Sequence, residues 1–503
     1  MQSNNTLLNT NPLIRFLNKP ADDFTRDDLI RFIENQGIQM LNFRYAGGDG
    51  RLKTLNFIIK NREHLETILS AGERVDGSSL FPFYVEPGSS DLYVVPRYRS
   101  AFLNPFSEIP ALDILCSYFD KDGLPFASSP EYILQKAQAS LHKETGFDFE
   151  VMGELEYYVI SEKNPLYEAA DQRGYHESSP FCKWEMLRTE AMHAIAACGG
   201  FIKYGHSEVG TFTESGLLYE QNEIEFTPVK LEDAADQLLV AKWILRSLAY
   251  KYGVTVTFAP KITTGKAGSG MHIHTRLLKN GKSVMTDGDQ LSDTAKKAIA
   301  GYLTMARSLT SFGNTIPTSY FRLVPHQEAP TTICWGDRNR SVLVRVPLGW
   351  RKTANAMILH ANPKEKENSG SYSDKQTVEF RCPDGSADVY LLGAGLAVAA
   401  RHGLTMKNSL DYAHKTYVDI NIFDEKYKER VTALKHLPFS CWDSAEALEE
   451  QRDIYQTDDV FPPVIIDGII KHLKSYNDQH LRESVKHNEK EVLKLVNRFL
   501  HCG

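Results

Sequence analysis

The sequence has few of the features that mark secreted, membrane-spanning or disulfide-rich proteins. Its seven cysteines are odd in number and form no Cys-x-x-Cys pair, which argues against a disulfide framework and a thiolate zinc site. The longest apolar stretch, residues 389–400, ends at Arg401, short of the roughly 20 residues that span a bilayer. Residues 1–13 lack the basic and then apolar pattern of a signal peptide. We therefore expect a cytoplasmic protein with no membrane partner.

The chain also lacks an excess of positive charge. It carries 57 Lys and Arg residues against 64 Asp and Glu residues, a net charge of −7, so nothing attracts it to nucleic acid. With 42% hydrophobic and 24% charged residues among 503, the composition is that of a globular protein rather than a disordered or fibrous one. Small-molecule chemistry with no nucleic-acid partner is the favoured class.

The first hundred or so residues predict a small α+β domain at 20–120. Residues 25–36 predict a helix that begins with a Thr25 and Asp28 capping box. Residues 40–46 and 51–59 alternate as strands around a glycine-rich turn, which predicts a hairpin, and residues 62–71 predict a second helix.

A linker composition at residues 119–129 places the domain boundary, and residues 128–503 predict a larger domain of alternating strands and helices. Residues 350–376 are rich in Lys, Asn, Ser and Gly and predict a long exposed loop. The chain ends in a predicted amphipathic helix whose apolar side carries Leu481, Val485, Val492, Val496 and Phe499.

Two pairs of residues that could bind a metal or take part in catalysis lie in strand-like segments. Glu154 and Glu156 are two residues apart in an apolar context, and so are His272 and His274, which places each pair on one face of a strand. Either pair alone is more often a solvated surface than a site. The apolar neighbours of the glutamates favour a half-buried strand, in which an unpaired carboxylate is too costly to keep.

Glu208, Glu223 and Glu379 are further candidates in strand-like segments, although a surface salt bridge explains each one equally well from spacing alone. Converging carboxylates repel one another by roughly 4 kcal/mol per pair at about 4 Å, and divalent cations would offset this repulsion. Oxygen-rich ligation with some imidazole and no thiolate favours Mg²⁺ or Mn²⁺.

Arginines are dense in one part of the sequence. Arginine binds phosphate and carboxylate groups bidentately, so several arginines near a metal site predict an anionic substrate such as a nucleoside triphosphate; structural ion pairs are the alternative. Glycine-rich phosphate loops are absent from the sequence, so metals and arginines would hold the phosphates. The residues concerned are Arg322, Arg338, Arg340, Arg345 and Arg381.

Taken in chain order, seven strings resemble the glutamine synthetase family, closest to its bacterial type I branch. The resemblance runs from about Asp28 to the C-terminus. It implies an α+β protein with an N-terminal β-grasp domain and a C-terminal catalytic domain of the glutamine synthetase and guanido kinase type. The strings are Val75-Asp76-Gly77-Ser78-Ser79, Glu154-x-Glu156, Gln221-Asn222-Glu223-Ile224, Gly268-Ser269-Gly270-Met271-His272-x-His274, Arg322-Leu323-Val324-Pro325 leading to Glu328-Ala329-Pro330, Arg338-Asn339-Arg340-Ser341, and Glu379-Phe380-Arg381-x-Pro383-Asp384.

The resemblance implies a role for each matching residue. One metal would be held by Glu156, Glu208 and Glu223, and another by Glu154, His272 and Glu379. The nucleotide would contact His274, Arg340 and Arg345, and glutamate would contact Arg322, Gly268 and Arg381. The ammonium pocket would comprise Asp76, Ser79 and Tyr175, the first two from a neighbouring subunit, and Glu328 would lie on a flap that shields the intermediate.

The implied reaction is ATP-dependent ligation of ammonia to L-glutamate through γ-glutamyl phosphate. The implied cofactors are Mg²⁺ or Mn²⁺, about two to three ions per site, with ATP as co-substrate. The implied assembly is a homo-oligomer of two stacked hexamers. Two alternatives stay open: a γ-glutamyl ligase for an organic amine or polyamine, and a catalytically silent scaffold of the same fold.

Four departures from the family pattern surround the predicted site. Ala267 replaces a usual Asn, and Arg276 replaces a common Ser. About seven extra residues, including 211–218, separate Glu208 from Glu223, and roughly twenty extra residues precede Glu379.

Overall fold

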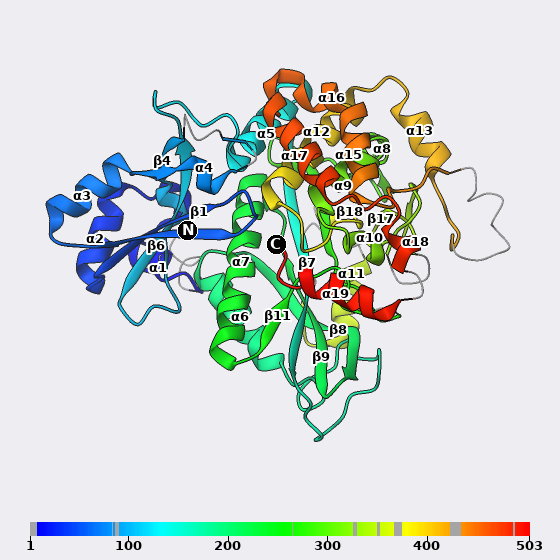
Figure 1. Cartoon of the computed structure of the whole chain (residues 1–503), viewed down its shortest axis with the longest axis horizontal. Coiled ribbons are helices and arrows are strands. Elements are labelled where there is room, and N and C mark those ends of the chain that lie inside the picture. Colours follow the sequence, from blue (N-terminus) through cyan, green and yellow to red (C-terminus); the bar gives the residue numbers. More distant parts are fainter. Residues whose placement is uncertain are drawn as a thin grey trace.

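The computed structural model describes residues 8–82, 84–85, 90–263, 265–324, 329–349, 353–366, 375–422, 434–485 and 488–503. Figure 1 shows an N-terminal sheet with its helices beside a larger mixed body of strands and helices. The α+β prediction is confirmed. The predicted domain bounds, 20–120 and 128–503, stay predictions.

The N-terminal sheet has the strand order β2-β1-β6-β4-β3, with β5 pairing to β6. Its central pair, β1 and β6, is parallel, and the remaining pairs are antiparallel. The elements are α1 (Pro12–Leu17), η1 (Ala21–Asp23), α2 (Arg26–Gln36), β1 (Met40–Ala46), β2 (Leu52–Ile58), α3 (Arg62–Ala71), β3 (Glu73–Asp76), α4 (Gly77–Leu80), β4 (Asp91–Pro96), η3 (Tyr98–Ser100), β5 (Phe102–Leu103) and β6 (Ala111–Phe119).

Local chemistry explains the start of this region. The capping box is present as predicted: the Thr25 side chain accepts a hydrogen bond from the Asp28 N–H, and the Asp28 carboxylate accepts one from the Thr25 N–H. Gly37 ends α2 in the left-handed conformation with φ 64°. The predicted hairpin and both predicted helices are therefore confirmed. Buried side chains of α2, α3 and the sheet form one apolar core.

The larger body is built on a ten-stranded sheet with the main order β16-β17-β18-β12-β7-β9-β8. Its strands are β7 (Asp148–Glu162), β8 (Ile202–Glu214), β9 (Leu217–Phe226), β10 (Val229–Lys230), β11 (Thr255–Thr257), β12 (Met271–Lys279), β13 (Lys282–Ser283), β16 (Trp335–Asp337), β17 (Val344–Val346) and β18 (Val378–Phe380), and β14 (Thr286–Asp287) pairs separately with β15 (Gln290–Leu291).

Helices pack around this sheet and around one another. They are α5 (Pro130–Thr145), α6 (Glu185–Ala197), α7 (Leu231–Tyr252), α8 (Asp293–Thr304), α9 (Ala306–Gly313), α10 (Ser319–Arg322), α11 (Thr353–Ala361), α12 (Val389–Thr405), α13 (Ser409–Thr416), α15 (Cys441–Glu450), α16 (Arg452–Gln456), η6 (Thr457–Asp459), α17 (Pro463–Ser475), α18 (Leu481–Val485) and α19 (Glu489–Phe499). The apolar stretch at residues 389–400 lies in α12, which is buried along most of its length between α5 and α8.

No single helix among the described residues combines the length and apolarity needed to cross a membrane. The helices α12 and α13 meet those criteria only as a pair, and a bend of 110° separates them.

Two predictions about helices and loops need correction. The predicted final helix is two helices, because the Asn488 side chain accepts a hydrogen bond from the Glu491 N–H and starts α19 anew. The apolar side nevertheless forms, since Val485, Val492 and Val496 are buried together. The segment at 350–376 is not wholly a loop, because it contains α11.

Candidate active site

Candidate residues on the larger sheet line up in rows that run across the strands. In the first row, Glu156 of β7 lies opposite Glu223 of β9, and Glu223 lies opposite His206 of β8. Directly opposed residues of neighbouring strands project from the same face, so all three side chains point into one space. The period-two prediction for the glutamates is confirmed by their positions on β7.

The second row places His272 of β12 opposite Glu154 of β7, then Glu225 of β9 and Tyr204 of β8. A third row on the same face comprises His274 opposite Glu379 of β18, and Arg345 of β17 beyond it. The sheet therefore brings together glutamates and histidines that are far apart in the sequence.

The rows form the floor of a cavity of about 950 Å³. The cavity is lined by all six predicted metal ligands and by most of the predicted substrate and nucleotide contacts. These residues are Glu154, Glu156, Glu208, Glu223, His272 and Glu379, together with Tyr175, Gly268, His274, Arg322, Arg340, Arg345 and Arg381. Of the other predicted residues, Glu328 lies outside the described part of the chain.

Asp76 and Ser79 do not line this cavity within the single chain. They lie at the start of α4, where the Ser79 hydroxyl donates a hydrogen bond of 2.6 Å to the exposed Asp76 carboxylate. Hydrogen bonds from Ser79 and Ser78 lower the pKa of Asp76 to about 2, so this carboxylate is ionised at neutral pH. Their assignment to a neighbouring subunit's pocket stays a prediction.

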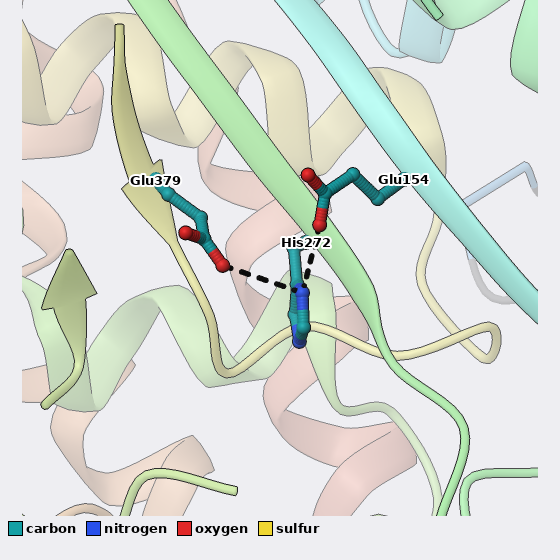
Figure 2. A group of neighbouring side chains, drawn as sticks. All are labelled: Glu154, His272 and Glu379. Atoms are coloured by element: carbon teal, nitrogen blue, oxygen red, sulfur yellow. Dashed lines mark hydrogen bonds and ion pairs between the residues drawn. The ribbon is translucent and has the colours of Figure 1, made fainter. Parts of the chain in front are cut away.

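Glu154, His272 and Glu379 offer ligand atoms that all lie within 4.8 Å of one another. Figure 2 shows the two carboxylates on either side of the imidazole, whose Nδ1 is 3.0 Å from a Glu154 oxygen and 3.4 Å from a Glu379 oxygen. All three side chains are largely buried. Two carboxylates and one imidazole are a ligand set suited to Mg²⁺ or Mn²⁺.

Cationic side chains compensate the charge of this group. Arg345 Nη1 donates to one Glu379 oxygen at 2.7 Å, and Arg381 Nε donates to the other at 3.0 Å. His274 Nε2 lies 2.7 Å from the second Glu154 oxygen, and its Nδ1 lies 2.8 Å from the Thr377 hydroxyl. Both carboxylates are thus held in fixed orientations.

The pKa values of these carboxyls follow from that compensation. Burial raises the pKa of Glu154, but the His274 and His272 imidazoles outweigh burial and hold it well below its usual value. Burial and the Glu154 carboxylate raise the pKa of Glu379, but Arg381 and the two histidines lower it by more, so the pKa of Glu379 lies below its usual value. Both carboxyls are therefore ionised, the form that binds a cation.

Glu223 is in the opposite electrostatic situation. Burial, together with the carboxylates of Glu154, Glu156, Glu208 and Glu225, raises the pKa of Glu223 well above its usual value. A crowded group of carboxylates with uncompensated charge is the arrangement that a divalent cation stabilises. Glu156, Glu208 and Glu223 therefore fit the divalent-cation site that the sequence predicts.

Glu208 lies in a bulge of β8, between Ser207 and Thr211. Ser207 pairs with Asn222 and Thr211 with Glu220, so the segment with Glu208 spans more residues than the facing part of β9. Within it, the Gly210 N–H donates to the Gln221 side chain at 3.0 Å.

Arg322 and a glycine-rich turn close the other end of the cavity. Arg322 Nη1 donates to the Cys382 carbonyl at 2.9 Å, and its Nη2 lies 3.3 Å from His272 Nε2. A Cβ on Gly270 would lie 2.4 Å from Arg322 Nη2, and a Cβ on Gly268 would lie 2.9 Å from Arg322 Cγ. Glycine is therefore required where this turn meets the guanidinium.

Among the cavity-wall residues that sequence reasoning missed are Lys203, Tyr204, His206 and Glu225. Ligand atoms of His206, Glu223 and Glu225 lie within 4.8 Å of one another, and Lys203 Nζ pairs with Glu225 at 2.6 Å. The alternation that identified Glu154 and Glu156 also joins Glu223 to Glu225, so the signal was present in the sequence.

Comparisons with known proteins agree on one family. Residues 127–493 match the model of the glutamine synthetase catalytic domain. A glutamine synthetase from Microchaete diplosiphon is 31% identical over 482 residues, covering 89% of this chain and 94% of the relative. A glutamine synthetase from Methanosarcina mazei is 30% identical over 437 residues, covering 85% of this chain and 88% of the relative.

Solved structures show the same fold at lower identity. The Plasmodium falciparum glutamine synthetase has a TM-score of 0.75 at 19% identity, covering 93% of this chain and 99% of that chain. A ligand-free structure of GmaS has a TM-score of 0.70 at 19% identity, covering 92% of this chain and 99% of that chain.

Proposed function

This chain belongs to the glutamine synthetase family of ligases, and we propose that it joins ammonia to L-glutamate with ATP, through γ-glutamyl phosphate. The observation that carries the proposal is the convergence of carboxylates, imidazoles and arginines on one cavity of about 950 Å³. A cavity of this volume has room for a nucleotide together with an amino acid.

In this proposal, Glu156, Glu208 and Glu223 hold one divalent cation, and Glu154, His272 and Glu379 hold another. Bound there, the cations would neutralise phosphate oxygens of ATP. The ion pairs of Glu379 with Arg345 and Arg381 support the second set, because they orient the carboxylate.

The remaining roles are assigned to the chain's own cations. Arg340 and Arg345 bind the triphosphate beside His274, Arg322 and Gly268 bind the amino-acid end of glutamate, and Arg381 binds its side-chain carboxylate. A γ-carboxylate oxygen attacks the γ-phosphorus, and the bond to the ADP oxygen breaks. Arg340 stabilises the charge on the transferred phosphoryl group.

Ammonia then attacks the acyl carbon, and phosphate leaves. Only neutral ammonia is nucleophilic, so Asp76 is proposed to attract the ammonium ion by its charge and to help remove its proton, with Ser79 and Tyr175 completing the pocket. Glu328 is proposed to exclude water from the acyl phosphate. Because Asp76 does not line the cavity of its own chain, we propose that a neighbouring subunit supplies it and that the protein is a homo-oligomer. By resemblance to the family, we propose that the assembly is two stacked hexamers and that it acts in the cytoplasm.

The test is phosphate release from ATP with Mg²⁺, L-glutamate and ammonium, combined with mass analysis of the product. The proposal requires that release depend on both glutamate and ammonium, and that glutamine be formed. If glutamate-dependent phosphate release requires methylamine, ethanolamine or a polyamine in place of ammonium, the result would favour the second candidate. No glutamate-dependent release with any amine would indicate the silent scaffold.

The second candidate, a γ-glutamyl ligase for an organic amine, is favoured by one specific feature of the cavity. The His206 ring lies 4.4 Å from the His176 ring, 5.5 Å from the Tyr175 ring and 5.9 Å from the Tyr204 ring, centroid to centroid. Aromatic faces next to carboxylates such as Glu225 bind organic ammonium groups.

A further inference from the structure

The insertion at residues 211–218 is an ordered extension of the β8–β9 hairpin. Cross-strand pairing continues from Thr211 opposite Glu220 to Glu214 opposite Leu217. The turn residues, Ser215 and Gly216, have φ values of 52° and 80°, which is the backbone geometry of a tight two-residue hairpin turn. The extra residues therefore form a rigid element beside the cavity.

This extension packs against the loop that leads to Gly268. The Phe212 ring stacks on the Tyr219 ring at 4.5 Å and meets the Tyr158 ring edge-on at 6.0 Å. Ile262, in the loop, is buried in the same apolar cluster. Lys266, four residues further along the loop, places its Nζ 5.6 Å from the centre of the Phe212 ring.

Two side chains connect this packing to the backbone of Ala267. The Ala267 N–H donates to Gln172 Oε1 at 2.8 Å, and the Tyr158 hydroxyl donates to the Ala267 carbonyl at 2.9 Å. The N–H of Gln172 itself donates to the Thr211 carbonyl at 2.7 Å. The contacts thus run from the hairpin extension through Gln172 to the residue that precedes Gly268.

The turn that follows is held equally firmly. Gln221 Nε2 donates to the Gly268 carbonyl at 3.0 Å, and the Gly270 N–H donates to Glu156 at 2.7 Å. A Cβ on Gly268 would lie 2.5 Å from the Pro260 carbonyl oxygen, so this backbone has little room to shift. An alanine side chain has no hydrogen-bonding atom, so only the backbone groups of Ala267 fix its place.

We propose that Gln172 and Tyr158 are positioning residues for the glutamate subsite, and that the hairpin extension at 211–218 holds them and the loop in place. This inference rests on the proposed function, in which L-glutamate contacts Gly268. The two hydrogen bonds to Ala267 set the position of the Gly268 peptide relative to Arg322. A small displacement of that peptide weakens glutamate binding and leaves the nucleotide end of the cavity unchanged.

The test uses Gln172→Met and Tyr158→Phe, each of which removes one hydrogen bond to Ala267 and keeps most of the side-chain volume; Gln172→Met also removes the longer bond of 3.5 Å from Gln172 Nε2 to the Thr211 carbonyl. We expect each variant to raise the KM for L-glutamate about fivefold to tenfold, with kcat and the KM for ATP within about twofold of the wild type. Gln172→Glu keeps an acceptor for the Ala267 N–H and should restore a KM near that of the wild type. Glu214→Ala, at an exposed position of the extension, is the matched control.

An unchanged KM for glutamate in both variants overturns the inference. A fall in the midpoint of thermal unfolding together with equal rises in both KM values also overturns it, because that pattern indicates a purely structural role. Should either variant fail to fold, Phe212→Leu tests the same path, with an expected rise of about threefold in the KM for glutamate. Failure of the proposed function is distinguishable, since the wild type would then show no glutamate-dependent phosphate release.

Discussion

Glu156 on β7 and Glu223 on β9 are direct cross-strand partners, so two carboxylates occupy one row of the sheet. Like charges directly opposite each other destabilise a sheet. The raised pKa of Glu223 reflects burial first and the neighbouring carboxylates second. The energetic consequence of this pair can be measured with and without a cation.

Glu223→Gln should stabilise the metal-free protein and weaken its response to metal. In EDTA, we expect the free energy of unfolding to rise by about 1–2 kcal/mol, because the raised pKa of Glu223 means that folding must either bind a proton or bury a charge among other carboxylates, and glutamine requires neither. Mn²⁺ should raise the melting temperature of the wild type more than that of the variant. Glu162→Gln, an exposed change at the end of the neighbouring strand β7, should alter neither quantity, and an equal Mn²⁺ response in Glu223→Gln would exclude Glu223 as a ligand.

Asp76→Ala should impair the use of ammonia far more than the binding of ATP. The carboxylate is exposed and its pKa is about 2, so it is a permanent negative charge at working pH. We expect the KM for ammonium to rise by about tenfold or more, with the KM for ATP nearly unchanged. Ser79→Ala, which removes one hydrogen bond to that carboxylate, should give a smaller change in the same direction. An unaltered dependence on ammonium would remove Asp76 from the pocket.

Glu131→Gln should change the pH dependence of stability. Burial raises the pKa of Glu131 from 4.5 to about 7, although the N–H of Tyr118 donates to its carboxylate and opposes the shift. The stability contributed by the protonated form is complete below about pH 4.5 and is lost as the pH rises through about 7. The variant's free energy of unfolding should therefore gain about 3 kcal/mol on the wild type between pH 4 and pH 8.

Urea unfolding at fixed pH values measures that difference directly. The substitution keeps an oxygen to accept from Tyr118, so the geometry is retained. A constant difference between the variant and the wild type across this range would show that the carboxyl titrates normally.

Asp236→Ala should weaken the attachment of the N-terminal sheet to the larger body. Arg97 donates to both Asp236 oxygens at 2.9 Å, and the Tyr390 hydroxyl donates to one of them at 2.7 Å. Removal of the carboxylate takes one of the two carboxylate partners from the buried Arg97 guanidinium, which stays paired with Glu232, and takes the acceptor from the Tyr390 hydroxyl; we expect a cost of about 2–3 kcal/mol of unfolding free energy. Arg62→Ala removes an exposed ion pair with Glu66 and should cost less than about 1 kcal/mol. Similar losses in both variants would contradict the argument.

Local signals in the sequence predicted local structure well. The capping box at Thr25, the glycine-rich turn after Ala46 and the alternation around Glu154 each depend on neighbours a few residues away. The break before α19 could also have been anticipated, because an Asn three residues before a Glu is an N-cap pattern within a long apolar repeat.

The completed site could not be predicted from spacing. Alternation places Glu225 on the same face as Glu223, but His206 and the two glutamates meet the residues of β7 only because β9 lies between β7 and β8, and strand order is set by long-range packing rather than by nearby residues. The bulge that presents Glu208 likewise depends on how β8 pairs with β9. The assigned roles of the site residues stay predictions until ligands are tested.

The bulge in β8 also determines what a change in the length of the β8–β9 hairpin would do. From Ser207 to Thr211 the strand advances four residues while its partner advances two, from Asn222 back to Glu220. The surplus is even, so side chains beyond the bulge keep the same inside and outside phase as those before it. A change in the length of the hairpin tip would therefore leave the carboxylates beneath it facing the cavity, and would act instead on the packing of Phe212 against Tyr158 and Tyr219.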